Sequence, residues 1–320
     1  MDRIATLHTE LAAILERHTV GLADCQTAVP NLALFRRDAP ARPAVCLVEP
    51  SVVMVARGAK RLLVGGQGYD YGPERFLMTS IDLPANSEVV AASADKPCVG
   101  LVLKLDIRLL AELIAQSGRA PARERTADQR VGVGHVTAPM LEPVVRLARL
   151  LDEPAATAVL SPLILREIHY RLLESDQSAR LWQVASVGSQ SHRIARAIDW
   201  LKVHYAQPLR IDELAERVQM SASSLHHQFR QLTAMSPLQY QKWLRLSEAR
   251  RLMLNEGADA ASAAFRVGYE SPSQFSREYS RLFGAPPRRD VEAMRPPVPV
   301  SPPRSSRRGS PSPSAAVPLR

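Results

Sequence analysis

Short apolar runs alternate with polar and turn-forming residues between about residues 24 and 110. The runs are AVCLVEP, SVVMVA, RLLVGG, FLMTSIDL, EVVAAS and CVGLVLKL, and Pro, Gly, Asn or Asp separates them at intervals of about 8–12 residues. Runs of this length with such boundaries are typical of strands joined by turns. The pattern predicts an antiparallel sandwich or barrel.

Helical periodicity replaces this pattern on both sides of the strand-rich segment. MDRIATLHTELAAILERH predicts an amphipathic helix within residues 1–23, and it lacks the continuous apolar stretch of a signal peptide. PMLEPVVRLARLLD and LSPLILREIHYRLLES predict helices between about residues 106 and 180. After the turn-like SVGSQS, further helices run to about residue 290. The predicted fold class is α+β, in which an antiparallel barrel with its helices precedes an all-α domain.

The all-α domain, expected over residues 190–292, contains an internal repeat. Each copy has a short helix, a tight turn and a serine-capped helix: IDELAERV with SASSLHHQFRQL, then ASAAFRV with SPSQFSREYSRLF. In the turns, Gly268 can adopt the left-handed conformation, whereas Gln219 and Met220 can do so only at a conformational cost. Two short helices joined in this way form a helix-turn-helix motif. The repeated positions are Val218, Ser221, Leu225, Phe229 and Pro237, which return as Val267, Ser271, Phe275, Tyr279 and Pro287.

The segment between the copies, SPLQYQKWLRLSEARRLML, predicts one long helix. Ser236 can cap it, Pro237 is favourable at its first position, and no breaker occurs before about Leu254. Such a helix spans about 25 Å. It could hold two helices in successive major grooves, which lie roughly 34 Å apart along one face of DNA.

Positive charge is concentrated in the same part of the chain. The net charge is +9; residues 1–191 contain 21 basic and 21 acidic side chains, whereas residues 192–320 contain 20 and 11. The excess predicts a polyanionic partner, most often nucleic acid. The last residues, 293–320, are basic and rich in proline and serine, and they predict a disordered tail because they have little to bury.

The serine-capped helix of the first copy has a polar face of hydrogen-bond donors. Leu225, Phe229 and Leu232 define its apolar side by their helical spacing. The opposite side contains no acidic residue and carries Ser223, His226, His227 and Arg230. These side chains can donate to phosphates and base edges, which would repel carboxylates. The alternative is a solvated surface, but such a surface normally mixes both signs of charge.

Two sets of segments resemble the AraC/XylS family of transcription regulators. IDELAERVQMSASSLHHQF, TAMSPLQYQKWLRLSEARRLML and AAFRVGYESPSQFSREYSRLFGAPPRRD, within about residues 192–290, are similar to the family's double helix-turn-helix domain. ARGAKRLLVGGQGYDYGPERFLMTSIDLP is similar to the cupin-like β-barrel of its N-terminal regulatory domain, expected over residues 24–180. The resemblance implies double-stranded DNA as a partner, with the second helix of each unit in the major groove.

The resemblance also assigns roles to individual residues. Arg230 is implied to contact a phosphate. This chain departs from the usual pattern at three positions: Ala234 replaces a frequent glycine, so the turn there is expected to differ slightly; Arg210 replaces a Ser or Thr cap; and His227 replaces a frequent arginine. The residues implied to face the bases are Ser223, His226 and His227 in the first unit and Ser273, Gln274, Ser276 and Arg277 in the second.

Metal and enzyme chemistry find little support in the sequence. Cupin barrels often bind a metal through strand histidines, yet none of the eight histidines lies between residues 24 and 110. GGQG is interpreted as a hairpin turn, since it does not precede a helix. His169 is interpreted as a core or interface residue, and the three cysteines as free thiols of a reducing cytosol. We expect no catalytic residues, no cofactor and no bound metal.

The barrel can instead offer an apolar site for a small organic effector, such as an aldehyde or an aromatic compound. The candidate lining residues are Cys46, Met54, Tyr69, Tyr71 and Met78. A wide apolar stripe in PMLEPVVRLARLLD, formed by Leu141, Val144, Val145, Leu147 and Leu151, predicts a homodimer through the helices between about residues 139 and 174.

These observations together predict a cytoplasmic, sequence-specific DNA-binding regulator that responds to an effector, with RNA polymerase as a further partner. No run of about 18 apolar residues occurs, so no membrane span is expected. Two alternatives remain open. One is a ligand-independent DNA-binding dimer, and the other is a metal-free cupin enzyme fused to a DNA-binding domain.

Overall fold

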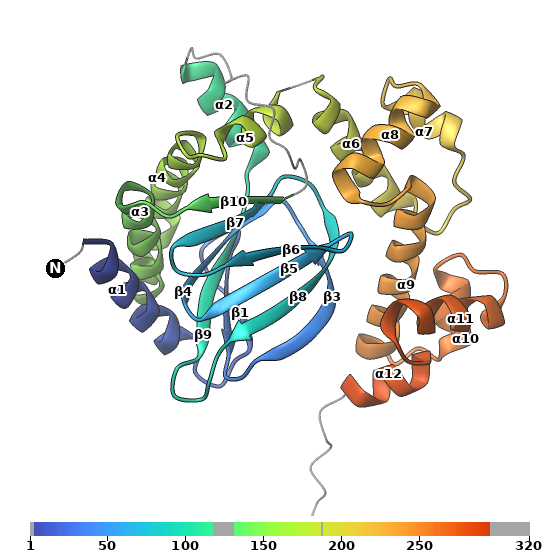
Figure 1. The fold of residues 1–320 in the computed structure, drawn as a ribbon, viewed down its shortest axis with the longest axis horizontal. Coiled ribbons are helices and arrows are strands. Elements are labelled where there is room, and N and C mark those ends of the chain that lie inside the picture. The colour runs from blue at the N-terminus through green and yellow to red at the C-terminus, as the bar shows by residue number, and fades with distance from the viewer. Residues whose placement is uncertain (1–2, 118–130, 187, 295–320) are drawn as a thin grey trace, which may run out of the picture.

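The computed structural model describes residues 3–117, 131–186 and 188–294, and it places ten strands in two antiparallel sheets within these ranges (Figure 1). The first sheet has the order β1 (Asp24–Gln26), β2 (Leu32–Arg37), β9 (Cys98–Lys104), β4 (Ser51–Arg57), β7 (Arg75–Thr79) and β10 (Val131–His135). The second has the order β3 (Ala41–Val48), β8 (Leu83–Ala91), β5 (Ala59–Val64) and β6 (Gln67–Tyr71).

The predicted antiparallel, cupin-like architecture is confirmed. Each sheet is hydrogen-bonded separately, so the barrel consists of two facing sheets and is not closed. Each of the six apolar runs forms a strand. The segment expected to be wholly helical also contributes β10, which pairs with β7 from Val131 opposite Thr79 to His135 opposite Arg75. Its sequence, VGVGH, is too short and too rich in glycine to give a strand signal.

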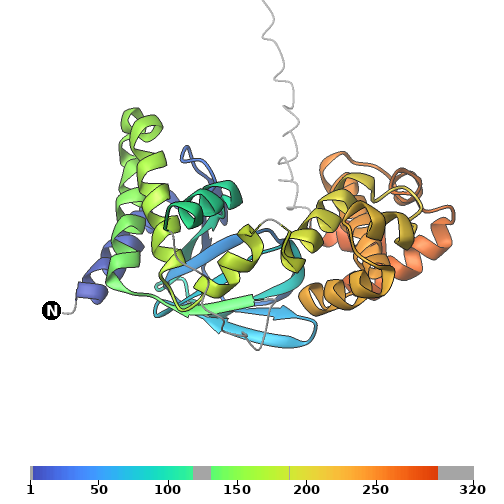
Figure 2. The same ribbon diagram turned by 90° about the horizontal axis from the view of Figure 1, so that it is seen from above.

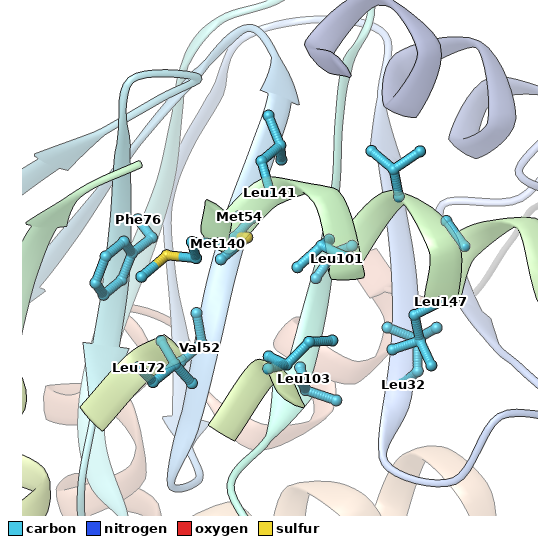
Figure 3. Packing of buried hydrophobic residues seen from close by; sticks show 14 of the residues in the cluster. Leu32, Val52, Met54, Phe76, Leu101, Leu103, Met140, Leu141, Leu147 and Leu172 are labelled. Carbon is cyan, nitrogen blue, oxygen red and sulfur yellow. The ribbon is translucent and has the colours of Figure 1, made fainter. Parts of the chain in front are cut away.

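Helices cover one face of the six-stranded sheet. They are α1 (Arg3–His18), α2 (Ile107–Ser117), α3 (Ala138–Arg149), the 3-10 helix η1 (Leu150–Asp152), α4 (Pro154–Leu173) and α5 (Ser178–Ala185). Figure 3 shows Leu147 of α3 beside Leu32 of this face, and Met140 of α3 beside Phe76. This is the core on which α3 depends.

The apolar stripe of α3 is therefore not a dimer surface. Leu141, Val144, Val145 and Leu147 are each no more than 1% exposed, and Leu151 packs against the same core. The prediction that this stripe mediates dimerisation is wrong, because α1, α4 and the sheet of the same chain already cover it. The large exposed apolar side chains lie instead on the next helix, α4: Val159, Leu160, Leu163 and Tyr170.

His169 of α4 is confirmed as a satisfied core residue. Its Nε2 accepts a hydrogen bond from the backbone N–H of Asp106 (3.0 Å), and its Nδ1 lies 2.7 Å from the carbonyl of Leu165, to which it donates. Burial lowers the pKa of His169. The imidazole thus joins α4 to the start of α2 in its neutral form.

The remaining helices form a second lobe beside the sheets, as Figures 1 and 2 show. We call α6 (Gln190–His204), α7 (Ile211–Arg217) and α8 (Ala222–Thr233) the first unit, and α10 (Ala260–Arg266), α11 (Pro272–Phe283) and α12 (Pro287–Met294) the second unit. The long helix α9 (Pro237–Asn255) joins them. The tail predicted for residues 293–320 lies outside the described residues from residue 295 onward.

The repeat is confirmed as two matched helix-turn-helix motifs. Each motif has a first helix of 7 residues and a second of 12. Ser221 accepts the N–H of Ser224 at the start of α8, and Ser271 accepts that of Gln274 at the start of α11. Ser236 forms a complete capping box at the start of α9. The three helices therefore begin directly after the predicted capping serines.

The two units also share backbone conformations that their residue types did not predict. Gln219 has a φ of 58°, like Gly268 with 87°, so it adopts the left-handed conformation in spite of the expected cost. Arg193 donates to its carbonyl (2.9 Å) and holds the turn in place. Ala234 has a φ of 62° and Gly284 a φ of 80°, and each N–H closes the preceding helix. The expected difference at Ala234 is therefore absent, because the helix end imposes one geometry on either residue.

The first unit packs directly on the sheets. One continuous apolar cluster includes Phe35 and Val53 from between the sheets and Ile198 and Trp243 from the helices. No helix in the described part of the chain combines the length and apolar character needed to cross a bilayer.

Ala234 and Gly284 form a matched pair for testing this geometry. Left-handed backbone costs an L-residue about 1–2 kcal/mol, so Ala234→Gly should raise the free energy of unfolding by about 1 kcal/mol and Gly284→Ala should lower it by a similar amount. A side chain at Gly284 meets no neighbouring atom, so only the backbone term changes there. Denaturant unfolding of the two variants measures both; shifts of the same sign would contradict the shared geometry.

Candidate nucleic-acid interface

Helix α8 presents the donor face that its sequence predicts. Leu225 and Phe229 are fully buried, whereas Ser223, His226 and Arg230 are exposed on the other side. His227 is also exposed. Among the described residues, neither histidine nor Arg230 has a hydrogen-bond or ion-pair partner. Their donors are therefore available to an external acceptor.

Helix α11 presents the equivalent face of the second unit. Phe275 and Tyr279 are fully buried, and their rings lie 5.5 Å apart. The hydroxyl of Tyr279 donates to the buried carboxylate of Asp290 (2.7 Å), which pins α12 against this side. The opposite side carries Ser273, Gln274 and Arg277, all exposed, with Ser276 half-buried.

The sequence analysis did not identify Glu278, an acidic residue on α11. Glu278 is 20% exposed and accepts hydrogen bonds from Tyr269 (2.7 Å), Lys242 (3.0 Å) and Gln274 (3.2 Å). Burial alone would raise the pKa of Glu278, but these donors lower it, so the carboxylate is ionised and neutralised by Lys242. Its place four residues after Gln274 is the sequence signal that could have revealed this contact. The charge therefore does not oppose a phosphate backbone.

The long helix α9 sets the separation of the two faces. Its 19 residues give a length of about 28 Å, and Figure 1 shows α8 and α11 beside its two ends. Tyr240 and Trp243 of α9 pack with the first unit, and Leu252 and Met253 pack with the second. A rigid separation of this size matches successive major grooves.

The contact between the sheets and the first unit includes a buried ion pair. Asp82, in the connection between β7 and β8, is paired with Lys202 of α6 at 2.8 Å. Tyr240 donates to the backbone carbonyl of Asp82 (3.2 Å). Burial raises the pKa of Asp82, although Lys202 opposes this effect. A buried carboxylate without its partner would be strongly unfavourable, so this contact resists separation of the two parts.

A groove of about 450 Å³ lies next to this contact, between β3 and the helices. Its apolar lining includes Leu47 from the sheet and Trp243 and Phe283 from the helices. Lys202, Arg250 and Arg251 also line it, and they are paired with the carboxylates of Asp82, Asp290 and Glu248, respectively. Of the five residues predicted to line an effector site, Cys46 contributes to this groove.

The structure does not bring those five residues together. Cys46, Tyr69 and Tyr71 pack against the core between the sheets. Met54 and Met78 belong to the core on the helix-covered face, and Figure 3 shows Met54 beside Met140. Tyr69 and Tyr71 share one side of β6, but Met54 and Met78 point to the opposite side of their sheet. The single five-residue pocket is therefore a wrong prediction.

Lys60 is an ionisable residue of the inter-sheet region that the sequence reasoning missed. Its Nζ lies 4.3 Å from the centroid of the Phe35 ring, and its partner across the sheet is Tyr71. Burial lowers the pKa of Lys60, and the charge of Arg37 adds to this effect. Lys60 shares its side of β5 with the buried Leu62, and this spacing could have identified it.

Within the described ranges, no group of three or more His, Cys, Asp or Glu side chains is arranged to hold a metal ion. Cys25, Cys46 and Cys98 are free thiols. The described residues therefore provide hydrogen-bond donors and positive charge on the exposed faces of α8 and α11, together with an apolar groove.

Comparison with known families agrees with both halves of this description. Residues 28–180 match the sequence model of the AraC-type transcriptional regulator N-terminus, and residues 214–292 match that of a helix-turn-helix domain. The HTH-type transcriptional activator RhaS of Escherichia coli strain SE11 is 32% identical over 100 residues, which is 31% of this chain and 36% of RhaS. RhaS of Escherichia fergusonii is 29% identical over 158 residues, or 46% of this chain and 53% of that protein. The chain thus spans between about a third and half of these curated relatives.

Solved structures resemble the whole fold at low sequence identity. Apo ToxT from Vibrio cholerae has a TM-score of 0.56 at 9% identity, covering 83% of this chain and 99% of its own. ToxT bound to (E)-4-(8-methylnaphthalen-1-yl)but-3-enoic acid has a TM-score of 0.56 at 10% identity, covering 82% and 97%. ToxT bound to an unsaturated fatty acid has a TM-score of 0.53 at 10% identity, covering 82% and 93%. At these identities the likeness concerns the fold.

Proposed function

The chain belongs to the AraC/XylS family of transcription regulators, and we propose that it recognises a specific double-stranded DNA site through α8 and α11. The observation that carries this proposal is the pair of matched helix-turn-helix motifs, each with an exposed face of hydrogen-bond donors, at the two ends of α9. Nothing in these faces suggests a catalytic role, and we assign none.

In this proposal, exposed side chains with hydrogen-bond donors on α8 and α11 recognise the bases. We assign Ser223, His226 and His227 to one major groove, and Arg230 to a phosphate beside it. In the second groove Arg277 has the strongest potential for sequence discrimination, because a guanidinium can donate two hydrogen bonds to one guanine. The other assigned residues of this groove are Ser273, Gln274 and Ser276.

The full-length protein should protect two DNA segments about one helical turn apart when it is bound to a site selected from random duplexes. The full chain is the appropriate material, because the first unit shares its core with the sheets. Hydroxyl-radical footprinting measures the protection. A single protected segment would contradict the two-groove arrangement.

Arg277→Ala tests the role of a single residue, and its affinity for duplexes that differ at one base pair is the measured quantity. It should relax the preference at one base pair by about 1–3 kcal/mol and leave the other positions unchanged. Arg281→Ala on the same helix, at an exposed position outside the assigned set, should not relax any position. A uniform loss of affinity across all sequences would make Arg277 a phosphate contact.

We further propose that the groove between β3 and α9 is the effector site, and that its ligand is an amphipathic carboxylic acid. The groove combines an apolar lining with basic side chains that already pair with carboxylates of the chain, and its volume lies within the usual range for small-molecule sites. Both ligands named for the ToxT structures are carboxylic acids. A ligand here would contact the sheets and the DNA-binding lobe together, and so could shift the balance between two arrangements of them.

Oleate should stabilise the protein against thermal unfolding by about 2.7 kcal/mol at a hundred times its dissociation constant, and oleyl alcohol should do so less. Leu47→Asp places a carboxylate in the groove and should abolish the effect of oleate. Leu63→Asp, on the same sheet but away from the groove, is the matched control. An undiminished response in the Leu47 variant would remove the effector from this groove, and no response in the wild type would favour a ligand-independent regulator.

We also propose a homodimer through α4. Val159 and Leu163 are 69% and 63% exposed, and Leu160 and Tyr170 extend the same helix surface. Exposed apolar side chains grouped on one helix are characteristic of an interaction surface. The proposal keeps the predicted range of residues 139–174 and moves the contact from α3 to α4.

Sedimentation velocity provides the test. Leu163→Glu should convert the dimer into a soluble monomer with an unchanged thermal transition, since Leu163 contributes little to the core. Val203→Glu, at an equally exposed valine of α6, is the control and should leave the dimer intact. A dimeric Leu163 variant would place the interface elsewhere.

The cellular setting follows from the same function. We propose that the protein acts in the cytoplasm, where its three thiols stay reduced, and that it engages RNA polymerase when bound at a promoter. An enlarged footprint in the presence of purified polymerase is the expected sign of this contact.

A further inference from the structure

The side chain of Arg245 joins the two units from the middle of α9. Its Nε donates to the carbonyl of Tyr205 (2.7 Å) and its Nη1 to the carbonyl of Gly268 (2.8 Å). Its Nη2 donates to the carbonyls of Ala206 (3.2 Å) and Gln207 (3.0 Å). The three carbonyls at 205–207 follow α6 in the first unit, and Gly268 forms the turn of the second. One guanidinium therefore holds backbone from both units.

Arg245 occupies the point where α9 passes from one core to the other. Trp243 and Leu244 belong to the apolar cluster of the first unit. Leu246 and Ala249 belong to that of the second. The partly buried Tyr205 and Leu282 pack against both clusters, whereas the buried residues of each cluster fix one unit against its own part of α9. The polar contacts of Arg245 connect them across the boundary.

The chemistry of these contacts suits an arginine in particular. The carbonyls that follow α6 lie at the negative end of the helix dipole and lack partners within the helix. A guanidinium places five donors in one rigid plane, so it can reach several carbonyls on different segments at once. Lysine has a single donor centre on a flexible stem and could not bridge Tyr205 and Gly268 in the same way.

The two backbones also touch directly at this point. Gly268 has a φ of 87°, and a Cβ added there would lie 2.1 Å from the carbonyl oxygen of Ala206. No other residue type fits without moving one unit away from the other. The contact that Arg245 bridges is therefore closely packed as well as hydrogen-bonded.

We propose that Arg245 is a positioning residue that sets the spacing between the two DNA segments read by α8 and α11. This inference rests on the proposed DNA-binding function. One additional base pair between the segments moves the second by about 3.4 Å and turns it by about 35° around the DNA axis. Two units held in a fixed relation reject such a site, whereas units that can rock about α9 tolerate it.

The experiment measures affinity for a family of DNA duplexes in which the spacer of the selected site is shortened or lengthened by one base pair. We expect the full-length wild type to prefer its own spacer about tenfold, comparable to the effect of a mismatched base pair. Arg245→Met should reduce this preference to less than about threefold, because binding to the best duplex weakens whereas binding to duplexes with other spacers changes little. Arg245→Lys should lose the preference as well.

Gln241→Met is the matched control. Gln241 donates to the carbonyls of Tyr205 (3.1 Å) and Gln207 (2.7 Å), two of the groups that Arg245 contacts, but not to Gly268. Its loss should lower thermal stability and leave the spacer preference intact. If Arg245→Met lacks a cooperative thermal transition, Gly268→Ala disturbs the same contact from the second unit and should broaden the preference in the same way.

The outcomes separate this inference from the function on which it rests. A wild type that selects no DNA site overturns the proposed function. A wild type that selects a two-segment site, together with Arg245 and Gly268 variants that keep its spacer preference, overturns the positioning role alone. Recovery of the preference in Arg245→Lys would show that charge is sufficient, and would also overturn the bridging role.

Discussion

Helix α9 is buried in two separate cores, and the arrangement of the C-terminal lobe depends on this constraint. Its first half provides Tyr240, Trp243 and Leu244 to one cluster, and its second half provides Leu246, Leu252 and Met253 to the other. A continuous helix cannot change the direction of one half without moving the other. The positions of α8 and α11 are thus fixed by a single rigid element, and its capping box at Ser236 fixes where that element begins.

The two units differ in what else they contact. The first unit shares its cluster with the space between the sheets, and the Asp82–Lys202 ion pair adds a polar contact at the same place. The second unit has a core of its own, closed by Tyr279 and Asp290. A change in the sheets can therefore reach α8 directly, but it reaches α11 through α9 and the contact of Gly268 with Ala206. This asymmetry gives a regulatory domain a physical route to the recognition helices.

Polar side chains divide into two groups that match structural and functional roles. Glu278, Asp290 and His169 are buried or half-buried, and each has hydrogen-bond partners, because an unpaired buried polar group is unfavourable. Arg230, Arg277 and His226 are exposed, and the described residues offer them no partner. Exposed donors of this kind are what a partner with many acceptors, such as DNA, requires.

Much of this protein follows from local sequence signals. The strand runs, the serine caps at Ser221, Ser236 and Ser271, and the repeat of the two motifs depend on neighbours in the chain, so they could be predicted. The same holds for the donor face of α8, because helical spacing alone places Leu225 and Phe229 opposite His226 and Arg230.

Contacts between distant segments could only be decided by the tertiary structure. Strand alternation separates Met54 from Tyr71, but which face of each strand meets which helix depends on the packing of the sheets. The sequence of α3 predicts an apolar stripe, but it does not tell whether a partner or the same chain covers that stripe. The bridging by Arg245 arises because its side chain meets backbone carbonyls that are far apart in sequence, and local residue preference contains no information about such meetings.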